Sequence, residues 1–153
     1  MTQSSQISWS VKPFNDLTPL ELYHMLQLRQ LVFVVEQNCA YLDADGKDVK
    51  GWHVLGYDKN ALVATSRLLP QNVSYQEVSI GRVVSHPTAR MTGVGKELMT
   101  RSIAGCETLF GVQPIRIGAQ KYLKRFYESF GFRDIGQEYL EDGIPHLIML
   151  RDA

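Results

Sequence analysis

The stretch Arg90-Met91-Thr92-Gly93-Val94-Gly95 decides the fold through its position between two regular segments. A strand-like apolar run from Val78 to Val84 precedes it, and a helix-like segment beginning at Lys96 follows it. A turn with two glycines between a strand and a helix lets the backbone approach a ligand closely. It also leaves the unpaired N–H groups of the first helical turn free to bind a phosphate. The stretch therefore predicts a site for a small cofactor that carries a pyrophosphate.

Two other glycine-rich phosphate motifs do not fit this turn. A P-loop needs glycine five residues before Gly95, where Arg90 stands, and Ser or Thr after Lys96, where Glu97 stands. A dinucleotide fingerprint needs a third glycine at the position of Leu98. The remaining pattern, Arg-x-x-Gly-x-Gly, resembles the pyrophosphate loop of the GCN5-related N-acetyltransferases (GNAT family), which bind acetyl-coenzyme A. An ordinary glycine-containing turn is the competing interpretation of these six residues taken alone.

Length and composition favour one globular domain. The 153 residues fit a single domain over 1–153, with its core at about 7–150. Sixteen basic and sixteen acidic side chains cancel, which disfavours nucleic acid or an anionic membrane as a partner. No apolar run approaches the roughly 20 residues of a membrane span, and the polar start lacks a signal peptide's apolar stretch. Cys39 and Cys106 form no disulfide framework, so a cytoplasmic protein is expected.

The order of strand-like and helix-like patterns predicts an α/β fold with one mixed sheet. Strand patterns occur at 7–11, 52–57, 61–69, 78–84, 114–119, 132–139 and 145–150. Thr18-Pro19-Leu20-Glu21 predicts a helix start with a capping box, and further helices are expected from Lys96 and over 121–130. The resulting order, β-α(α)-β-β-β-α-β-α-β-β, leaves open a second helical segment after the first helix and places helices on both faces of the sheet. It is the order expected of the GNAT acyltransferase fold.

A long polar segment, 38–51, separates the first helix from the second strand. Its length favours a function over mere connection. Asp43, Asp45, Asp48, Cys39 and His53 could suggest a metal site. The aspartates lack the other ligands of an EF-hand and its closing Glu, and one Cys with one distant His is weak for zinc. No metal is therefore predicted.

The family resemblance extends from about Ile7 to Leu150. The segment 126–132, Phe-Tyr-Glu-Ser-Phe-Gly-Phe, resembles the Tyr-x-x-x-Gly-Phe segment of the family. The stretches 32–39, 43–46, 118–120 and 141–146 are similar to the ElaA-like branch. Three positions depart from the common pattern: Met91 replaces a usual Gly, Ser85 a common Val, and Gln120 a frequent Asn. The first two leave backbone contacts to the cofactor intact.

The resemblance implies roles for residues around the glycine turn. The backbone of Val83, Val84 and Ser85 would hold the pantetheine arm and polarise the thioester carbonyl, as an oxyanion hole does. The pyrophosphate would lie against Arg90, Thr92, Gly93, Val94, Gly95 and Lys96. Gln120 would make a separate contact with the cofactor. Tyr127 would be the general acid, because its reference pKa near 10 keeps it protonated at neutral pH. A core aromatic is the competing interpretation of Tyr127.

The general base and the acceptor site are less well defined by the sequence. Glu36 ends an apolar run, so a partly desolvated carboxylate with a raised pKa is expected there. His53 and His146 titrate in the useful range, and a water-mediated base remains open. Glu36, His53, Glu141 and His146 are expected to bind the acceptor, because neither the core nor the cofactor needs them.

These observations predict an N-acetyltransferase that moves an acetyl group from acetyl-CoA directly to a primary amine. The acceptor is a small molecule or a peptide, and a homodimer is one option for the oligomeric state. Two alternatives stay open. One is a non-catalytic CoA-binding module of the same fold. The other is an enzyme similar to the acyl-homoserine-lactone synthases, which Arg29, Val32-Phe33, Asp45 and Asp48 partly resemble.

Overall fold

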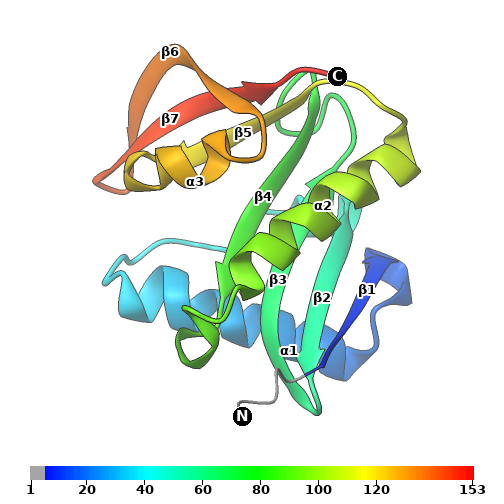
Figure 1. Cartoon of the computed structure of the whole chain (residues 1–153). Helices are drawn as coiled ribbons and strands as arrows, with labels where there is room; N and C mark the ends of the chain where they lie inside the picture. Colours follow the sequence, from blue (N-terminus) through cyan, green and yellow to red (C-terminus); the bar gives the residue numbers. More distant parts are fainter. Residues whose placement is uncertain (1–5) are drawn as a thin grey trace.

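A mixed sheet of seven strands organises the protein (Figure 1), whose computed structural model describes residues 6–153. The strands are β1 (Ile7–Pro13), β2 (Trp52–Asp58), β3 (Ala61–Leu69), β4 (Val78–Ser85), β5 (Ile115–Gln120), β6 (Phe132–Glu141) and β7 (Ile144–Arg151). Their order in the sheet is β1-β2-β3-β4-β5-β7-β6. Neighbouring strands are antiparallel except β4 and β5, which are parallel. The predicted mixed α/β fold is confirmed.

Three α-helices of the described residues flank the sheet: α1 (Pro19–Arg29), α2 (Val94–Phe110) and α3 (Lys124–Glu128). The predicted capping box starts α1: Thr18 Oγ1 accepts from Glu21 N at 3.1 Å, and Glu21 Oε1 accepts from Thr18 N at 2.9 Å. Helix α2 begins two residues earlier than predicted, because Gly93 takes a left-handed conformation at φ +85° and serves as its N-cap. No helix within residues 6–153 is both long enough and apolar enough to cross a membrane.

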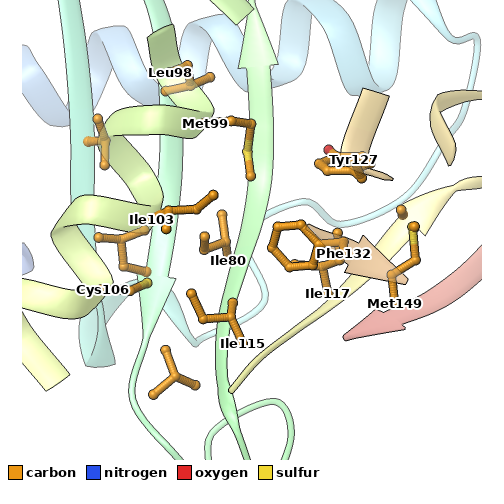
Figure 2. Close-up of a cluster of buried hydrophobic side chains, with 14 of the residues drawn as sticks. Ile80, Leu98, Met99, Ile103, Cys106, Ile115, Ile117, Tyr127, Phe132 and Met149 are labelled. Atoms are coloured by element: carbon orange, nitrogen blue, oxygen red, sulfur yellow. The ribbon is translucent and has the colours of Figure 1, made fainter. Parts of the chain in front are cut away.

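The helices cover opposite faces of the sheet. Met25, Leu28 and Val32 pack against Leu55 and Val84 on one face. On the other face α2 and α3 contribute to the larger core, where Figure 2 shows side chains of α2 beside those of β4, β5 and β7. Strand β3 is therefore covered on both sides and is buried continuously after its first residue, including its polar residues Thr65, Ser66 and Arg67.

The helical region that starts with α1 continues as a π-helical segment, η2 (Gln30–Glu36). Two of its hydrogen bonds span five residues, from Gln37 N to Val32 O at 3.1 Å and from Cys39 N to Val34 O at 3.0 Å. Such wide turns are rare and occur often at functional sites. Here they bring the end of η2 to the edge of a cavity in the sheet.

That cavity exists because β4 and β5 separate. Among the described strands, β4 pairs with β5 only at Val78–Ile115 and Ser79–Arg116. The pairing of β4 with β3 is interrupted by a bulge, and Arg82 in this part of β4 adopts a left-handed φ of +49°. A bulge bends and twists its strand, so β4 turns away from β5 beyond Ser79. The backbone groups of β4 that face β5 are thereby left open to a ligand.

Candidate active site

The gap between β4 and β5 holds a cavity of about 580 Å³. Its walls come from both strands, from the end of η2, from the start of α2, from α3 and from the β6–β7 hairpin. Segments far apart in the sequence meet here. The residues that matter below are Glu36, Cys39, Arg82, Val83, Val84, Ser85, Arg90, Gly95, Gln120, Tyr127, Glu141, Asp142 and His146.

One end of the cavity leads to the N-terminus of α2. No side chain within residues 6–153 caps this terminus, so the first-turn N–H groups face outward without a side-chain acceptor. Met91 at φ +66° and Gly93 at φ +85° turn the backbone sharply before the helix. A 17-residue helix with such an N-terminus suits an anion. This end can accept an anionic group, and the open edge of β4 can pair with an extended chain.

The predicted cofactor residues fall into two groups. Those that line the cavity are Val83, Val84, Ser85, Arg90, Gly95 and Gln120. Those that form the turn beyond the lining are Thr92, Gly93, Val94 and Lys96. The side chain of Val94 is buried in the core, and the Thr92 hydroxyl donates to the carbonyl of Ala89. These side chains are thus already occupied, and the turn can offer its backbone N–H groups instead.

Tyr127 combines both interpretations offered by the sequence. It is 7% exposed and belongs to the core cluster, and it also lines the cavity. Edge-on contacts with Phe126 and Phe132 fix its ring. Burial, with a smaller effect from Tyr122, raises the pKa of Tyr127 above its ordinary value. The hydroxyl therefore remains protonated at neutral pH and can donate a proton.

Glu36 does not lie in a desolvated cleft, and the expected rise of its pKa is wrong. Its carboxylate receives two hydrogen bonds from Arg90, at 2.5 and 2.7 Å, and both side chains are 40% exposed. The hydrogen bond from Arg90 lowers the pKa of Glu36. A carboxylate with a lowered pKa is a poor base, so the reason for assigning that role to Glu36 disappears. The pair instead connects η2 to the glycine turn.

His53 does not reach the cavity, which corrects its assignment to the acceptor site. Its side chain is 1% exposed within β2, and Nε2 lies 2.9 Å from the carbonyl of Asp48. Burial lowers the pKa of His53. It packs edge-on against Phe14. His53 is therefore a hydrogen-bonded core histidine.

Glu141 and His146, by contrast, are brought together in the cavity lining. Nε2 of His146 lies 3.4 Å from Oε2 of Glu141, and Nδ1 lies 2.7 Å from the carbonyl of Ile144. The ring stacks on Tyr139 with centroids 5.3 Å apart. The β6–β7 hairpin thus carries a polar pair at the end of the cavity formed by the last strands.

Three aspartates of the polar segment 38–51 form a largely buried network with three arginines from other parts of the chain, which the sequence pattern did not predict. Its members are Arg29, Asp43, Asp45, Asp48, Arg67 and Arg82. Arg29 contacts Asp43 at 2.7 Å and Asp48 at 2.8 Å. Arg82, which lines the cavity, pairs with Asp43 at 2.8 Å and with Asp45 at 3.2 Å. A charged residue inside the apolar strand β4 was the available signal.

Comparison with known sequences identifies the family of this chain. Residues 48–152 match the family described as an acetyltransferase (GNAT) domain. The protein ElaA of Escherichia coli strain K12 is 42% identical over 149 residues, covering 96% of this chain and 97% of ElaA. The chain belongs to the GNAT acetyltransferase family.

Solved structures agree with this assignment. The crystal structure of E. coli ElaA matches with a TM-score of 0.90 at 40% identity, covering 96% of this chain and all of that one (100%). An acyl-CoA N-acyltransferase from Pseudomonas aeruginosa gives 0.89 at 42% identity, with coverages of 94% and 99%. An aminoglycoside 6'-N-acetyltransferase complexed with coenzyme A gives 0.70 at 16% identity, with coverages of 94% and 96%, and shares the fold. The predicted ElaA-like resemblance is confirmed, and GNAT acetyltransferases use acetyl-CoA.

Proposed function

We propose that this protein is an N-acetyltransferase that moves the acetyl group of acetyl-CoA directly to a primary amine. One observation carries the proposal: the separation of β4 from β5 opens a cavity that leads to the uncapped N-terminus of α2. An elongated cofactor with a pyrophosphate fits this combination of an open strand edge and an anion site.

The glycine turn would hold the pyrophosphate through the backbone N–H groups of Gly93, Val94, Gly95 and Lys96. Arg90 would add a charged side chain at the cavity rim. The pantetheine arm would pair with the open edge of β4 at Val83, Val84 and Ser85. Gln120 stands opposite on β5, where its amide donates to Gln37 at 3.3 Å. The Gln120 side chain could turn toward the pantetheine arm if its hydrogen bond to Gln37 were replaced by one to the arm.

When bound, acetyl-CoA supplies the acetyl thioester that the amine attacks. A backbone N–H of the bulged segment of β4 would polarise the thioester carbonyl of the acetyl group, a contribution of about 3 kcal/mol per donor. Arg82 supports that segment, because its ion pairs with Asp43 and Asp45 fix its left-handed backbone. Tyr127 would donate its hydroxyl proton to the departing thiolate.

Direct transfer is favoured over a covalent acetyl-enzyme. Cys39 is the thiol in the cavity lining, and Cys106 is buried in the core. Burial and the charges of Asp142 and Glu141 raise the pKa of the Cys39 thiol. The thiolate is the nucleophilic form of cysteine, and this environment suppresses it. The acceptor amine is thus the better nucleophile for the acetyl carbon.

A matched pair of glycine variants tests the cofactor site. Gly93 and Gly136 both have a left-handed φ, +85° and +83°, and an added Cβ at either meets open space. Gly93→Asp and Gly136→Asp therefore impose similar backbone strain, but only the first places a negative charge beside the proposed pyrophosphate. Calorimetry should show a large loss of acetyl-CoA affinity for Gly93→Asp and little change for Gly136→Asp. Equal affinities for the two variants would show that the site is elsewhere.

Turnover separates an enzyme from a CoA-binding module. Tyr127→Phe keeps the ring and its packing and removes the proton donor. A loss of about 10²–10⁴-fold in the rate of amine acetylation is expected for a lost general acid. A wild-type protein that binds acetyl-CoA without acetylating any amine of a broad panel would instead support the binding module.

The residues that resemble acyl-homoserine-lactone synthases, Arg29, Asp45 and Asp48, are members of the buried network.

A further inference from the structure

The protonation of the His146 ring is determined by its neighbours. Nδ1 lies 2.7 Å from the carbonyl oxygen of Ile144, which can only accept a hydrogen bond. Nδ1 must therefore carry a proton. In the neutral ring Nε2 then has a free lone pair, as a base requires. The ring itself is held rigidly, because it is 6% exposed and stacks on Tyr139 across the β6–β7 pair.

The free nitrogen faces a carboxylate oxygen. Nε2 of His146 lies 3.4 Å from Oε2 of Glu141, and both are acceptors when the ring is neutral. An ammonium group has three protons and can donate to both at once, at hydrogen-bond distances of about 2.8 Å. We propose that His146 and Glu141 bind the ammonium of the acceptor between them, with His146 as the general base. This proposal rests on the acetyltransferase function proposed above.

The charges of the cavity favour a cation at this position. The two arginines of its lining are already neutralised inside the protein, Arg82 by Asp43 and Asp45 and Arg90 by Glu36. The lining also carries the carboxylates of Glu141 and Asp142 on the β6–β7 hairpin. An acceptor with its own carboxylate beside the amine would be repelled there. The geometry therefore favours simple amines and disfavours α-amino acids.

The other titratable groups around His146 are neutral and do not change the preference for a cation. Tyr139 stacks on the ring, and the hydroxyls of Tyr139 and Tyr75 both crowd the position of Gly118 on β5. Burial raises the pKa of both tyrosines, so they stay neutral. Cys39, on the segment that follows η2, contributes a neutral thiol for the same reason. Glu141 is thus the charged group closest to Nε2, and it favours a cation there.

The proposed step balances as follows. Nε2 of His146 takes one proton from the ammonium, and the free amine attacks the thioester carbon. The C–N bond of the amide forms as the C–S bond breaks, and the Tyr127 hydroxyl protonates the sulfur. The nitrogen loses its second proton, which restores the Tyr127 hydroxyl through solvent, and His146 passes its own proton to solvent. The products are the N-acetyl amine, coenzyme A and one proton.

A histidine-to-asparagine pair tests the base. His146→Asn retains an amide N–H that can donate to Ile144 and removes the Nε2 base. A loss of about 10²–10⁴-fold in kcat/KM for the amine is expected near neutral pH. The loss should shrink as the pH rises toward the pKa of the free amine, because deprotonated amine then needs no base. His24→Asn is the matched control: His24 contacts Tyr57 outside the cavity, and its replacement should leave the rate unchanged.

An exposed partner variant keeps the proposal testable if His146→Asn folds poorly. Glu141→Gln, on a side chain that is 57% exposed, should raise the KM for the amine about tenfold with a smaller change in kcat. Tyramine against tyrosine, and cadaverine against lysine, are matched probes that differ by a carboxylate. The wild type should acetylate tyramine faster than tyrosine and cadaverine faster than lysine, and Glu141→Gln should reduce both rate ratios.

The outcomes distinguish this inference from the proposed function. If the wild type acetylates amines and both His146→Asn and Glu141→Gln keep its rate, pH profile and preference, then the His146–Glu141 site is wrong and the acetyltransferase stands. If the wild type acetylates no amine on the panel, the acetyltransferase proposal itself fails. Unchanged acetyl-CoA affinity in both variants, measured by calorimetry, is expected because the pair lies on the β6–β7 hairpin and not on the glycine turn.

Discussion

The protein contains two arrangements of arginine with carboxylate that differ in burial. The network of Arg29, Arg67 and Arg82 with three aspartates is largely buried and joins α1, β3 and β4 to the segment 38–51. The Arg90–Glu36 pair is exposed at the cavity rim. Both contain short, charge-assisted contacts. Distance alone therefore does not separate a structural ion pair from one that can open for a ligand.

Burial determines how easily each arrangement can exchange partners. Removing one member of a buried network leaves an uncompensated charge in a medium that solvates it poorly. An exposed pair can be replaced by water or by another anion at little cost. The network therefore holds segment 38–51 and the bulge of β4 in place, and the exposed pair can yield Arg90 to a phosphate.

The largest effect is expected from breaking the network. Asp48 receives hydrogen bonds from both Arg29 and Arg67, at 2.8 and 3.0 Å. Asp48→Asn keeps the shape and removes the negative charge, which leaves excess positive charge in a buried site. A loss of about 3–5 kcal/mol in the free energy of unfolding is expected. Urea denaturation of wild type and variant measures it.

The matched comparison is an exposed helical pair. Glu97→Gln removes the partner of Arg101 on α2, where both side chains are about half exposed, 47% and 49%. Its effect on stability should be about 0.5 kcal/mol or less. If Asp48→Asn costs no more than Glu97→Gln, the network contributes nothing specific and the contrast with the exposed pairs is wrong.

Acid should weaken the network before it affects the core. Although burial opposes its charge, hydrogen bonds from Arg67 lower the pKa of Asp45 to about 2, and those from Arg29 lower the pKa of Asp48. A lowered carboxyl pKa gives stability that is present above the ordinary value, about 3.9, and is lost as the pH falls through the folded value. The urea midpoint should thus fall between about pH 4 and pH 2. The urea midpoint of an Asp45→Asn variant should fall less steeply with decreasing pH than that of the wild type. If the two midpoints fall equally steeply, the role of Asp45 is contradicted.

The comparison also shows what the sequence could predict. Local signals were sufficient for the capping box at Thr18–Glu21, the hairpin around Lys59 and the glycine turn before α2, because each depends on neighbouring residues. The resemblance to a family then ordered these elements into one sheet. The predicted start of α2 was two residues too late, because a left-handed Gly93 can cap a helix without any side chain.

The partners of charged side chains could not be predicted. Arg90 and Glu36 are 54 residues apart in the chain, and Arg29 and Asp48 are 19 apart. Whether Glu36 is desolvated or paired depends on such contacts, which leave no periodic pattern in the sequence. The same holds for His53 and His146: both lie in strands, and only the packing shows that the first is enclosed and the second faces the cavity.

A smaller effect is expected from removing the exposed arginine. Arg90→Gln takes a charged donor away from the proposed pyrophosphate site and leaves Glu36 without its partner. Affinity for acetyl-CoA should fall about tenfold, near the lower limit for a charge-assisted hydrogen bond, because the site is solvated. Calorimetry at low and high salt measures it, and the difference should narrow at high salt. Arg101→Gln, on the exposed side of α2, is the control and should leave the affinity unchanged.

The smallest effect, and the most specific, concerns Glu36. Arg90 must release this carboxylate before it can turn to a phosphate, so the pair competes with the cofactor. Glu36→Gln removes the competitor and the negative charge at the rim, and acetyl-CoA should bind about two- to fivefold more tightly, the equivalent of one exposed ion pair. The gain should vanish in the Arg90→Gln background, since nothing then remains to be released, and a double-mutant cycle measures that coupling. Glu97→Gln removes a similar charge from the first turn of α2 without freeing Arg90, so it separates release from simple electrostatics. Weaker binding by Glu36→Gln would mean that Glu36 positions Arg90 for the phosphate.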